Sequence, residues 1–165
     1  MAKYYLAYGS NLSVGQMLQR CPNAIYVGQT KLYDYKLMFR GSKTGSYLTI
    51  EEAKGYTVPC VVWKVSESDE ENLDYYEGYP TFYSKQTMDV TVYGFIDGME
   101  GDAVRTVEAF VYAMGKGHRA GVPSRRYWDV CKEGYRRFGF DLKILKKALE
   151  ESEMEEFFDW RGRRA

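Results

Sequence analysis

The stretch VPCVVWKV, residues 58–65, restricts the fold of this chain more than any other segment. It is nearly continuous in apolar residues. This pattern is typical of a strand buried on both faces, whereas apolar and polar residues alternate in a half-exposed strand. Ser66 follows directly and forms a capping-box pattern with Asp69, and acidic residues fill the first turn, where the helix dipole favours them. We therefore predict a central strand that leads directly into a helix, which ends at Gly78.

Alternating and helical patterns on both sides of this centre predict the remaining elements. The predicted strands are Lys3–Tyr8, Ala24–Phe39 as one strand or as two split near Asp34, Ser46–Ala53, Thr57–Val65, Phe82–Phe95 and Val104–Met114. Turns or loops are predicted at Arg40–Gly45, Asp97–Asp102 and Lys116–Val122, and further helices at Val14–Cys21, from Ser124 to Gly139, and at Asp141–Glu151. Several strands with segregated helices indicate an α+β fold that contains a small, barrel-like mixed sheet.

The chain shows no repeat, low-complexity tract or linker, so residues 1–151 are predicted to form a single domain. Residues 152–165 are predicted to form a C-terminal extension that is either docked or partly loose. Its aromatic residues Phe157, Phe158 and Trp160 favour docking, for which a second chain is one surface, because removing large apolar side chains from water is favourable. A homodimer is one arrangement to which this extension could contribute.

The balance of charge gives no reason to expect nucleic acid or a membrane surface as a partner. The 165 residues include 23 basic and 23 acidic side chains, so the formal net charge is zero. No apolar run approaches the ~20 residues that a membrane span needs, and no N-terminal signal pattern is present. Cys21, Cys60 and Cys131 are far apart and lack a CxxC spacing, which indicates reduced thiols. We therefore expect a cytoplasmic protein.

A single histidine, His118, argues against a zinc enzyme and against a nucleophile that a histidine activates. Chemistry in this chain must therefore come from carboxylates, tyrosines, lysines or backbone groups. The sequence holds 16 tyrosines. Tyrosine combines a large apolar ring with a polar hydroxyl, so it suits pockets that are apolar but need hydrogen bonds.

The stretch YLAYGSNL, residues 5–12, is a strand-like aromatic run that stops at a Gly-Ser-Asn turn. Successive backbone amides of residues 9–12 can form a nest for a carboxylate or an oxyanion. Gly9 would let a ligand approach the backbone closely. The alternative is a tight turn that caps the next helix, because Gly, Ser and Asn are common turn residues. The segment alone leaves both interpretations open.

A second candidate lies in NLDYYEGYPTFY, residues 72–83. Glu77 is placed at the end of the predicted helix, where the dipole disfavours a negative charge, and its aromatic neighbours remove water. Both effects raise the pKa of a carboxyl group, which suits it to acid–base work near neutral pH. The alternative is a solvated surface glutamate beside a turn. Asp74 could share a proton with Glu77 or lie on the helix face.

Three segments match one known family when they are taken together. They are YLAYGSNLS at the start, VVWKVSESDEENLDYYEGYPTFY in the middle, and AFVYAMGKGHRAGVPSRRY at residues 109–127. YGSNL alone is moderately specific, but a later glutamate in an LDxxEG context makes the combination strong. With these segments the chain resembles the γ-glutamylcyclotransferases and the wider AIG2-like superfamily, roughly from Lys3 to Glu151.

The resemblance implies a small β-barrel flanked by helices, and a reaction that needs no cofactor and no metal. In such enzymes the α-amine of a γ-glutamyl group attacks its own side-chain carbonyl, releasing 5-oxoproline and a free amine or amino acid. By motif position, Glu77 matches the catalytic glutamate, which takes a proton from the attacking amine and returns one to the leaving nitrogen. The residues that match the substrate-holding positions are Ala7, Tyr8, Gly9, Ser10, Asn11, Leu12, Tyr83, Tyr112 and Tyr127.

The expected partner is therefore a small-molecule γ-glutamyl substrate, and the family also contains dimers. One fold can host several functions, so a non-catalytic relative that binds a ligand or a partner is the alternative. The run GYPTF, residues 78–82, differs from the sequence that the glutathione-product cyclotransferase of animals has at the matching position. This run would shape the leaving-group side of the pocket. The reaction class therefore carries over better than the identity of the leaving amine, which the sequence leaves open.

Overall fold

Eight strands, one 3-10 turn and four α-helices make up the part of the chain that the computed structural model describes, which is residues 2–42, 45–97, 100–101, 103–115 and 117–164. The strands are β1 (Lys3–Ala7), β2 (Ile25–Ser42), β3 (Gly45–Val65), β4 (Tyr83–Tyr93), β5 (Ile96–Asp97), β6 (Glu100–Gly101), β7 (Val104–Met114) and β8 (Arg119–Ala120). The helices are η1 (Ser10–Leu12), α1 (Val14–Arg20), α2 (Glu67–Glu77), α3 (Arg125–Arg137) and α4 (Leu142–Arg164).

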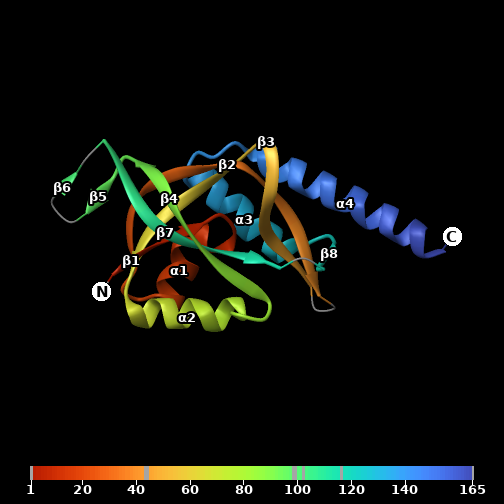
Figure 1. Cartoon of the computed structure of the whole chain (residues 1–165), viewed down its shortest axis with the longest axis horizontal. Helices are drawn as coiled ribbons and strands as arrows, with labels where there is room; N and C mark the ends of the chain where they lie inside the picture. The colour runs from red at the N-terminus through yellow and green to blue at the C-terminus, as the bar shows by residue number, and fades with distance from the viewer. Residues whose placement is uncertain (1, 43–44, 98–99, 102, 116, 165) are drawn as a thin grey trace.

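Five of the strands close into a small mixed barrel, around which the helices lie (Figure 1). They follow the order β3–β1–β7–β4–β2, and β2 pairs with β3 to complete the ring, while the short β8 adds to β2. The β1–β7 pair is parallel and the other pairs of the ring are antiparallel. This arrangement confirms the predicted α+β fold with a small mixed β-barrel flanked by helices.

The apolar run of residues 58–65 lies in the centre of the barrel wall, as predicted, because it belongs to β3 between β1 and β2. The two strands expected around residues 54–55 are instead one continuous strand of 21 residues. Opposite this point, Asp34 adopts a φ of 63°, and its carboxylate accepts a hydrogen bond of 2.9 Å from the Gly55 amide. The β2–β3 register shifts there, so both strands bend but continue.

Caps that the sequence predicts mark where three helices begin and where one of them, α2, ends. The Ser13 hydroxyl accepts from the Gln16 amide at the start of α1, and the Ser66–Asp69 capping box is complete at the start of α2. Gly78 ends α2 in the left-handed conformation, with a φ of 65°. The Ser124 hydroxyl caps α3 in the same way as Ser13 caps α1. These local signals fix where α2 stops, and therefore where its last side chain lies.

The final helix is longer than predicted. It was expected to end at Glu151, but α4 continues to Arg164. Ser152 is buried and accepts a hydrogen bond of 2.9 Å from the Phe39 amide, which holds the middle of α4 against β2. The C-terminal part of α4 projects beyond the barrel (Figure 1), and Phe157 and Phe158 are exposed.

The helix carries these aromatic side chains away from the barrel of their own chain, so their docking against a second chain stays a prediction. The division of the chain into residues 1–151 and 152–165 falls inside α4 and stays a prediction. The three predicted turns each include residues outside the described ranges, namely 43–44, 98–99 with 102, and 116. Within the described ranges, no helix is long and apolar enough to cross a membrane.

Candidate active site

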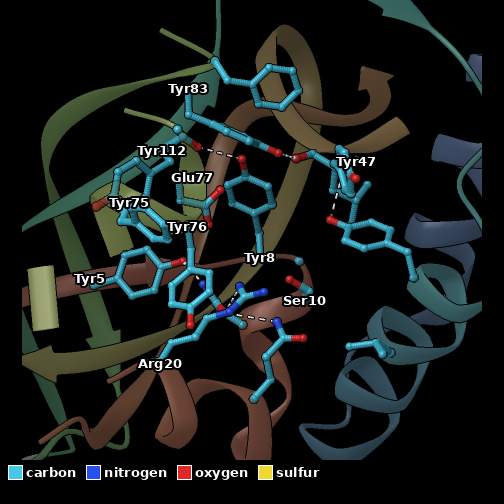
Figure 2. A pocket seen from close by; sticks show the side chains of 18 of the residues that line it. Tyr5, Tyr8, Ser10, Arg20, Tyr47, Tyr75, Tyr76, Glu77, Tyr83 and Tyr112 are labelled. Atoms are coloured by element: carbon cyan, nitrogen blue, oxygen red, sulfur yellow. Dashed lines mark hydrogen bonds between the residues drawn. The ribbon is translucent and has the colours of Figure 1, made fainter. Parts of the chain in front are cut away.

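A cavity of about 530 Å³ opens beside the end of α2, which is within the range of roughly 300–1,000 Å³ that small-molecule sites occupy. The turn after β1, the last residues of α1 and α2, the start of β3 and the start of α3 all contribute to its wall (Figure 2). The lining residues include Tyr5, Tyr8, Gly9, Ser10, Asn11, Gln16, Arg20, Tyr47, Leu48, Tyr75, Tyr76, Glu77, Phe82, Tyr83, Tyr112, Ser124, Arg126 and Tyr127.

Most of the residues predicted for the site come together in this cavity. Glu77 lines it, and so do Tyr8, Gly9, Ser10, Asn11, Tyr83, Tyr112 and Tyr127. Ala7 and Leu12 do not, which corrects the prediction for these two residues. Ala7 pairs with Val61 inside the sheet, and Leu12 is fully buried under α3. A side chain at Gly134 of α3 would come within 2.5 Å of the Leu12 Cβ, so Leu12 anchors the turn instead of facing a ligand.

The turn after β1 lines the cavity with Gly9, Ser10 and Asn11. The Leu12 amide donates to the Gly9 carbonyl oxygen at 3.0 Å, so it is used within the turn itself. In the part of the chain that the structure describes, the amides of Ser10 and Asn11 have no acceptor. A Cβ at Gly9 would lie 3.2 Å from the Tyr127 hydroxyl oxygen, so this position has little room for a side chain. The turn can therefore offer amide donors to a negatively charged or carbonyl oxygen.

Glu77 is the last residue of α2, and its half-buried side chain points into the cavity beside Tyr8 (Figure 2). Burial raises the pKa of its carboxyl group to about 7, and the positive charge of Arg20 partly opposes this rise. Among the described residues, none forms a hydrogen bond or an ion pair with the Glu77 carboxylate. A carboxyl group with this pKa exchanges protons readily near neutral pH, as a general acid or base must.

Asp74 lies on the same helix but does not share a proton with Glu77. Its carboxylate accepts a hydrogen bond of 2.6 Å from the Tyr112 hydroxyl and pairs with the Lys85 ammonium at 2.8 Å. Lys85 also pairs with Glu70, at 2.8 Å. Asp74 therefore belongs to a charged cluster that joins α2 to β4 and β7, and it is not part of the cavity lining.

The hydroxyl hydrogens of three predicted substrate-holding tyrosines bind protein acceptors. Tyr8 donates to the Tyr112 carbonyl oxygen at 2.6 Å, and Tyr83 donates to the Leu48 carbonyl oxygen at 2.8 Å. Tyr112 donates to Asp74, as described above. Tyr127 accepts from the Leu48 amide at 3.0 Å. These rings therefore form rigid walls, whose hydroxyl oxygens can still accept hydrogen bonds from a ligand.

These tyrosines are not candidates for proton transfer at neutral pH. Burial raises the pKa of Tyr8, Tyr83, Tyr112 and Tyr127 well above the ordinary value of 10.0, so their hydroxyl groups stay neutral. Glu77 is therefore the lining group whose pKa lies close to neutrality. Within the described ranges, no group of three or more His, Cys, Asp or Glu side chains is placed to hold a metal ion.

Sequence reasoning missed Arg20 and Tyr5, which both line the cavity. Both contact the buried side chain of Asn11, whose amide group donates to the Tyr5 hydroxyl at 3.0 Å and accepts from Arg20 at 2.9 Å. The Gln16 side chain also donates to the Asn11 side-chain oxygen, at 3.3 Å. Gln16 and Arg20 are four residues apart, so they lie on one face of α1. The spacing of Gln16 and Arg20, shortly after the turn at residues 9–11, is the sequence signal that could have indicated Arg20.

Comparison with known proteins identifies the family to which this chain is similar. The family model for gamma-glutamyl cyclotransferase, AIG2-like, matches residues 5–130. The gamma-glutamylcyclotransferase of Bos taurus is 32% identical over 150 residues, which cover 87% of this chain and 75% of the bovine protein. The Homo sapiens gamma-glutamylcyclotransferase is 31% identical over the same shares of the two chains.

Solved structures show the same fold. A gamma-glutamyl cyclotransferase structure superposes with a TM-score of 0.74 at 28% sequence identity, covering 90% of this chain and 86% of the other. YkqA from Bacillus subtilis superposes with a TM-score of 0.70 at 19% identity, which shows a shared fold alone. The family match over residues 5–130 and the curated relatives together show that this chain belongs to the gamma-glutamyl cyclotransferase, AIG2-like family.

Proposed function

We propose that this protein is a γ-glutamylcyclotransferase, which converts a γ-glutamyl amine or amino acid to 5-oxoproline and the free amine or amino acid. The observation that carries the proposal is the Glu77 carboxyl group, which faces the cavity without a partner among the described residues and has a pKa of about 7. Membership of the gamma-glutamyl cyclotransferase, AIG2-like family supports the same reaction.

The reaction needs one proton-transfer group and a site for one developing negative charge. The α-amine nitrogen attacks the side-chain carbonyl carbon, a carbon–nitrogen bond forms, and the carbonyl electron pair moves onto oxygen. Glu77 takes the proton that the attacking nitrogen loses, and then gives it to the leaving nitrogen. The carbonyl bond re-forms, the original amide bond breaks, and Glu77 returns to its carboxylate form.

The geometry of the cavity suits these demands. Ring closure is intramolecular, so the substrate itself brings the nucleophile close to its target. The amides of Ser10 and Asn11 can donate to the γ-glutamyl group and to the developing oxyanion. The rings of Tyr8, Tyr83 and Tyr112 form the wall beside Glu77 and keep its surroundings poor in water (Figure 2).

The charges of the lining favour a leaving amine that carries a carboxylate. Besides Arg20, which lies below Glu77, the lining holds a second cation, Arg126, and its anion is Glu77. Since Glu77 transfers protons, a cationic leaving amine would find no second carboxylate among the described lining residues. We therefore expect γ-glutamyl amino acids to be better substrates than γ-glutamyl diamines.

A panel of γ-glutamyl donors tests the proposal, with 5-oxoproline release as the readout. γ-Glutamyl-alanine and a γ-glutamyl diamine probe the leaving side, and the Glu77→Gln variant is the negative control. Calorimetry with 5-oxoproline runs in parallel. The wild-type protein is expected to release 5-oxoproline, with a higher kcat/KM for the amino acid derivative. Binding of 5-oxoproline without turnover of any donor would support the non-catalytic alternative instead.

A further inference from the structure

Arg20 is held firmly at the floor of the cavity. One guanidinium nitrogen donates to the Asn11 side-chain oxygen at 2.9 Å, and the guanidinium carbon lies 4.6 Å from the centre of the Tyr76 ring. The Asn72 side chain donates to the Arg20 carbonyl oxygen at 3.0 Å, which fixes the backbone at the end of α1. Figure 2 shows the guanidinium projecting into the cavity below Glu77. Arg20 is therefore oriented before any ligand binds.

The charge of Arg20 is not neutralised within the part of the chain that the structure describes. Its contacts there are a neutral amide and an aromatic ring, and no carboxylate lies within ion-pair distance. Arg40 provides the contrast, because its guanidinium pairs with both Glu51 and Glu155. A guanidinium has five donor hydrogens, and the Asn11 oxygen uses few of them. Arg20 can therefore receive an anionic ligand group.

The location of Arg20 relative to Glu77 indicates which ligand group this is. Arg20 and Glu77 line the same cavity, and Figure 2 shows the Arg20 guanidinium below the Glu77 carboxyl group. The positive charge of Arg20 also lowers the pKa of Glu77, against the larger effect of burial. In a γ-glutamyl group, the α-amine and the α-carboxylate are attached to the same carbon, about 2.5 Å apart from nitrogen to carboxyl carbon by standard bond lengths. An amine that reaches Glu77 therefore carries its carboxylate into the field of Arg20.

We propose that Arg20 binds the α-carboxylate of the γ-glutamyl group and so selects substrates in which this carboxylate is free. The inference rests on the proposed function, because the position of the amine at Glu77 defines the position of the carboxylate. The planar guanidinium matches a carboxylate with two parallel hydrogen bonds, which a lysine at this position could not reproduce. Glutamate whose α-carboxyl group is blocked, as within a peptide, is rejected.

The experiment varies the protein and the substrate together. γ-Glutamyl-alanine is compared with the same compound in which the glutamyl α-carboxylate is converted to a carboxamide, and lactam release gives kcat/KM for each. The variants are Arg20→Gln and Arg20→Lys, and Arg126→Gln is the matched control, because Arg126 lines the same cavity but is exposed. Circular dichroism and thermal denaturation establish that each variant is folded.

The wild-type protein is expected to prefer the free acid by roughly 10- to 100-fold, the range for hydrogen bonds to a charged group. Arg20→Gln reduces this ratio towards one, Arg20→Lys gives an intermediate ratio, and Arg126→Gln keeps the wild-type ratio. A wild-type protein without the preference overturns the inference, even if Arg20→Gln does not fold. So does an Arg20→Gln variant that loses activity equally on both compounds, because Arg20 would then act through structure alone.

A binding measurement separates failure of this inference from failure of the proposed function. Calorimetry compares 5-oxoproline with its carboxamide on the wild-type and Arg20→Gln proteins. If no donor is cyclised but 5-oxoproline binds in an Arg20-dependent manner and the carboxamide does not, the proposed catalysis fails and the Arg20 site stands. If turnover occurs but neither turnover nor binding depends on the carboxylate, catalysis stands and the Arg20 site fails. Absence of both turnover and carboxylate-dependent binding overturns both.

Discussion

Asp74 and Glu77 are less than one turn apart on α2, yet their carboxylates have different surroundings. Asp74 binds the Lys85 ammonium and the Tyr112 hydroxyl, both at less than 3 Å. Glu77 has no such partner among the described residues, and burial raises the pKa of its carboxyl group to about 7. A carboxylate whose charge is satisfied holds elements together, whereas one that is left unsatisfied is available for chemistry.

The difference follows from where each residue stands on the helix. Glu70 and Asp74 are four residues apart, so they share one face of α2, and Lys85 on β4 lies within reach of both. Glu77 is the last helical residue, and Gly78 turns the chain away directly after it. Its side chain therefore passes the charged cluster and enters the cavity.

The largest effect is expected when the Glu77 carboxylate is replaced by a neutral amide, and the same exchange at Asp74 is the matched comparison. Glu77→Gln keeps the shape of the side chain but cannot transfer a proton, so kcat/KM should fall by roughly 10²- to 10⁴-fold. Asp74→Asn leaves Lys85 paired with Glu70 and should reduce kcat/KM by less than about tenfold. Rates of 5-oxoproline release measure both. An equal loss in the two variants would break the distinction between the carboxylates.

The pH dependence of turnover sharpens the same distinction. If Glu77 must be deprotonated to accept a proton, kcat/KM should fall about tenfold per pH unit below about pH 7. The same limb should persist in Asp74→Asn, because Asp74 lies outside the cavity lining. The measurement is kcat/KM between pH 5 and pH 8 for both proteins. A wild-type profile that is flat through pH 7 would remove Glu77 from the role of base.

The end of α2 could be predicted from sequence because its signals are local. Ser66, Asp69 and Gly78 fix the start and the stop of the helix within a dozen residues, and Glu77 is located by the stop. The turn at Gly9 is equally local. The prediction that these distant segments share one cavity came from the family resemblance, since no spacing within either segment links them.

The features that the sequence did not reveal depend on contacts between different elements of the structure. Arg20 enters the cavity because α1 folds back onto the Asn11 side chain. β3 stays continuous because Asp34 accepts from Gly55 across the bulge, and α4 continues past Glu151 because Ser152 binds the Phe39 amide. The partner of Arg20 is nine residues away, across a turn, and the other two pairs are separated by 21 and 113 residues, so the pattern within a single helix or strand carries no information about these pairs.

Stability should also depend on pH through Glu77. The pKa of its carboxyl group is about 7 in the folded protein against an ordinary value of 4.5, so the folded state keeps a proton that the unfolded chain releases. The free energy of unfolding should therefore decrease as the pH rises from 4.5 to about 7. Glu77→Gln removes this contribution. The unfolding free energy of the variant minus that of wild type should therefore be larger at pH 8 than at pH 5, by on the order of 2 kcal/mol. Urea denaturation at both pH values measures it, and an unchanged difference would contradict the buried state of Glu77.

The smallest effect is expected from Lys85→Met, which changes the charged cluster around Asp74 and is measured as unfolding free energy. The variant removes the cation that lies between Glu70 and Asp74 and leaves two partly buried carboxylates without their shared partner, which should cost about 1 kcal/mol of unfolding free energy. Lys64→Met is the matched control, because Lys64 pairs with Asp97 at a site where its side chain is 31% exposed, against 17% for Lys85. An exposed pair contributes less, so this control should lose at most about 0.5 kcal/mol. If Lys85→Met unfolds as easily as Lys64→Met but loses as much activity as Glu77→Gln, the charged cluster serves the reaction more than the fold, and the two carboxylates of α2 belong to one functional unit.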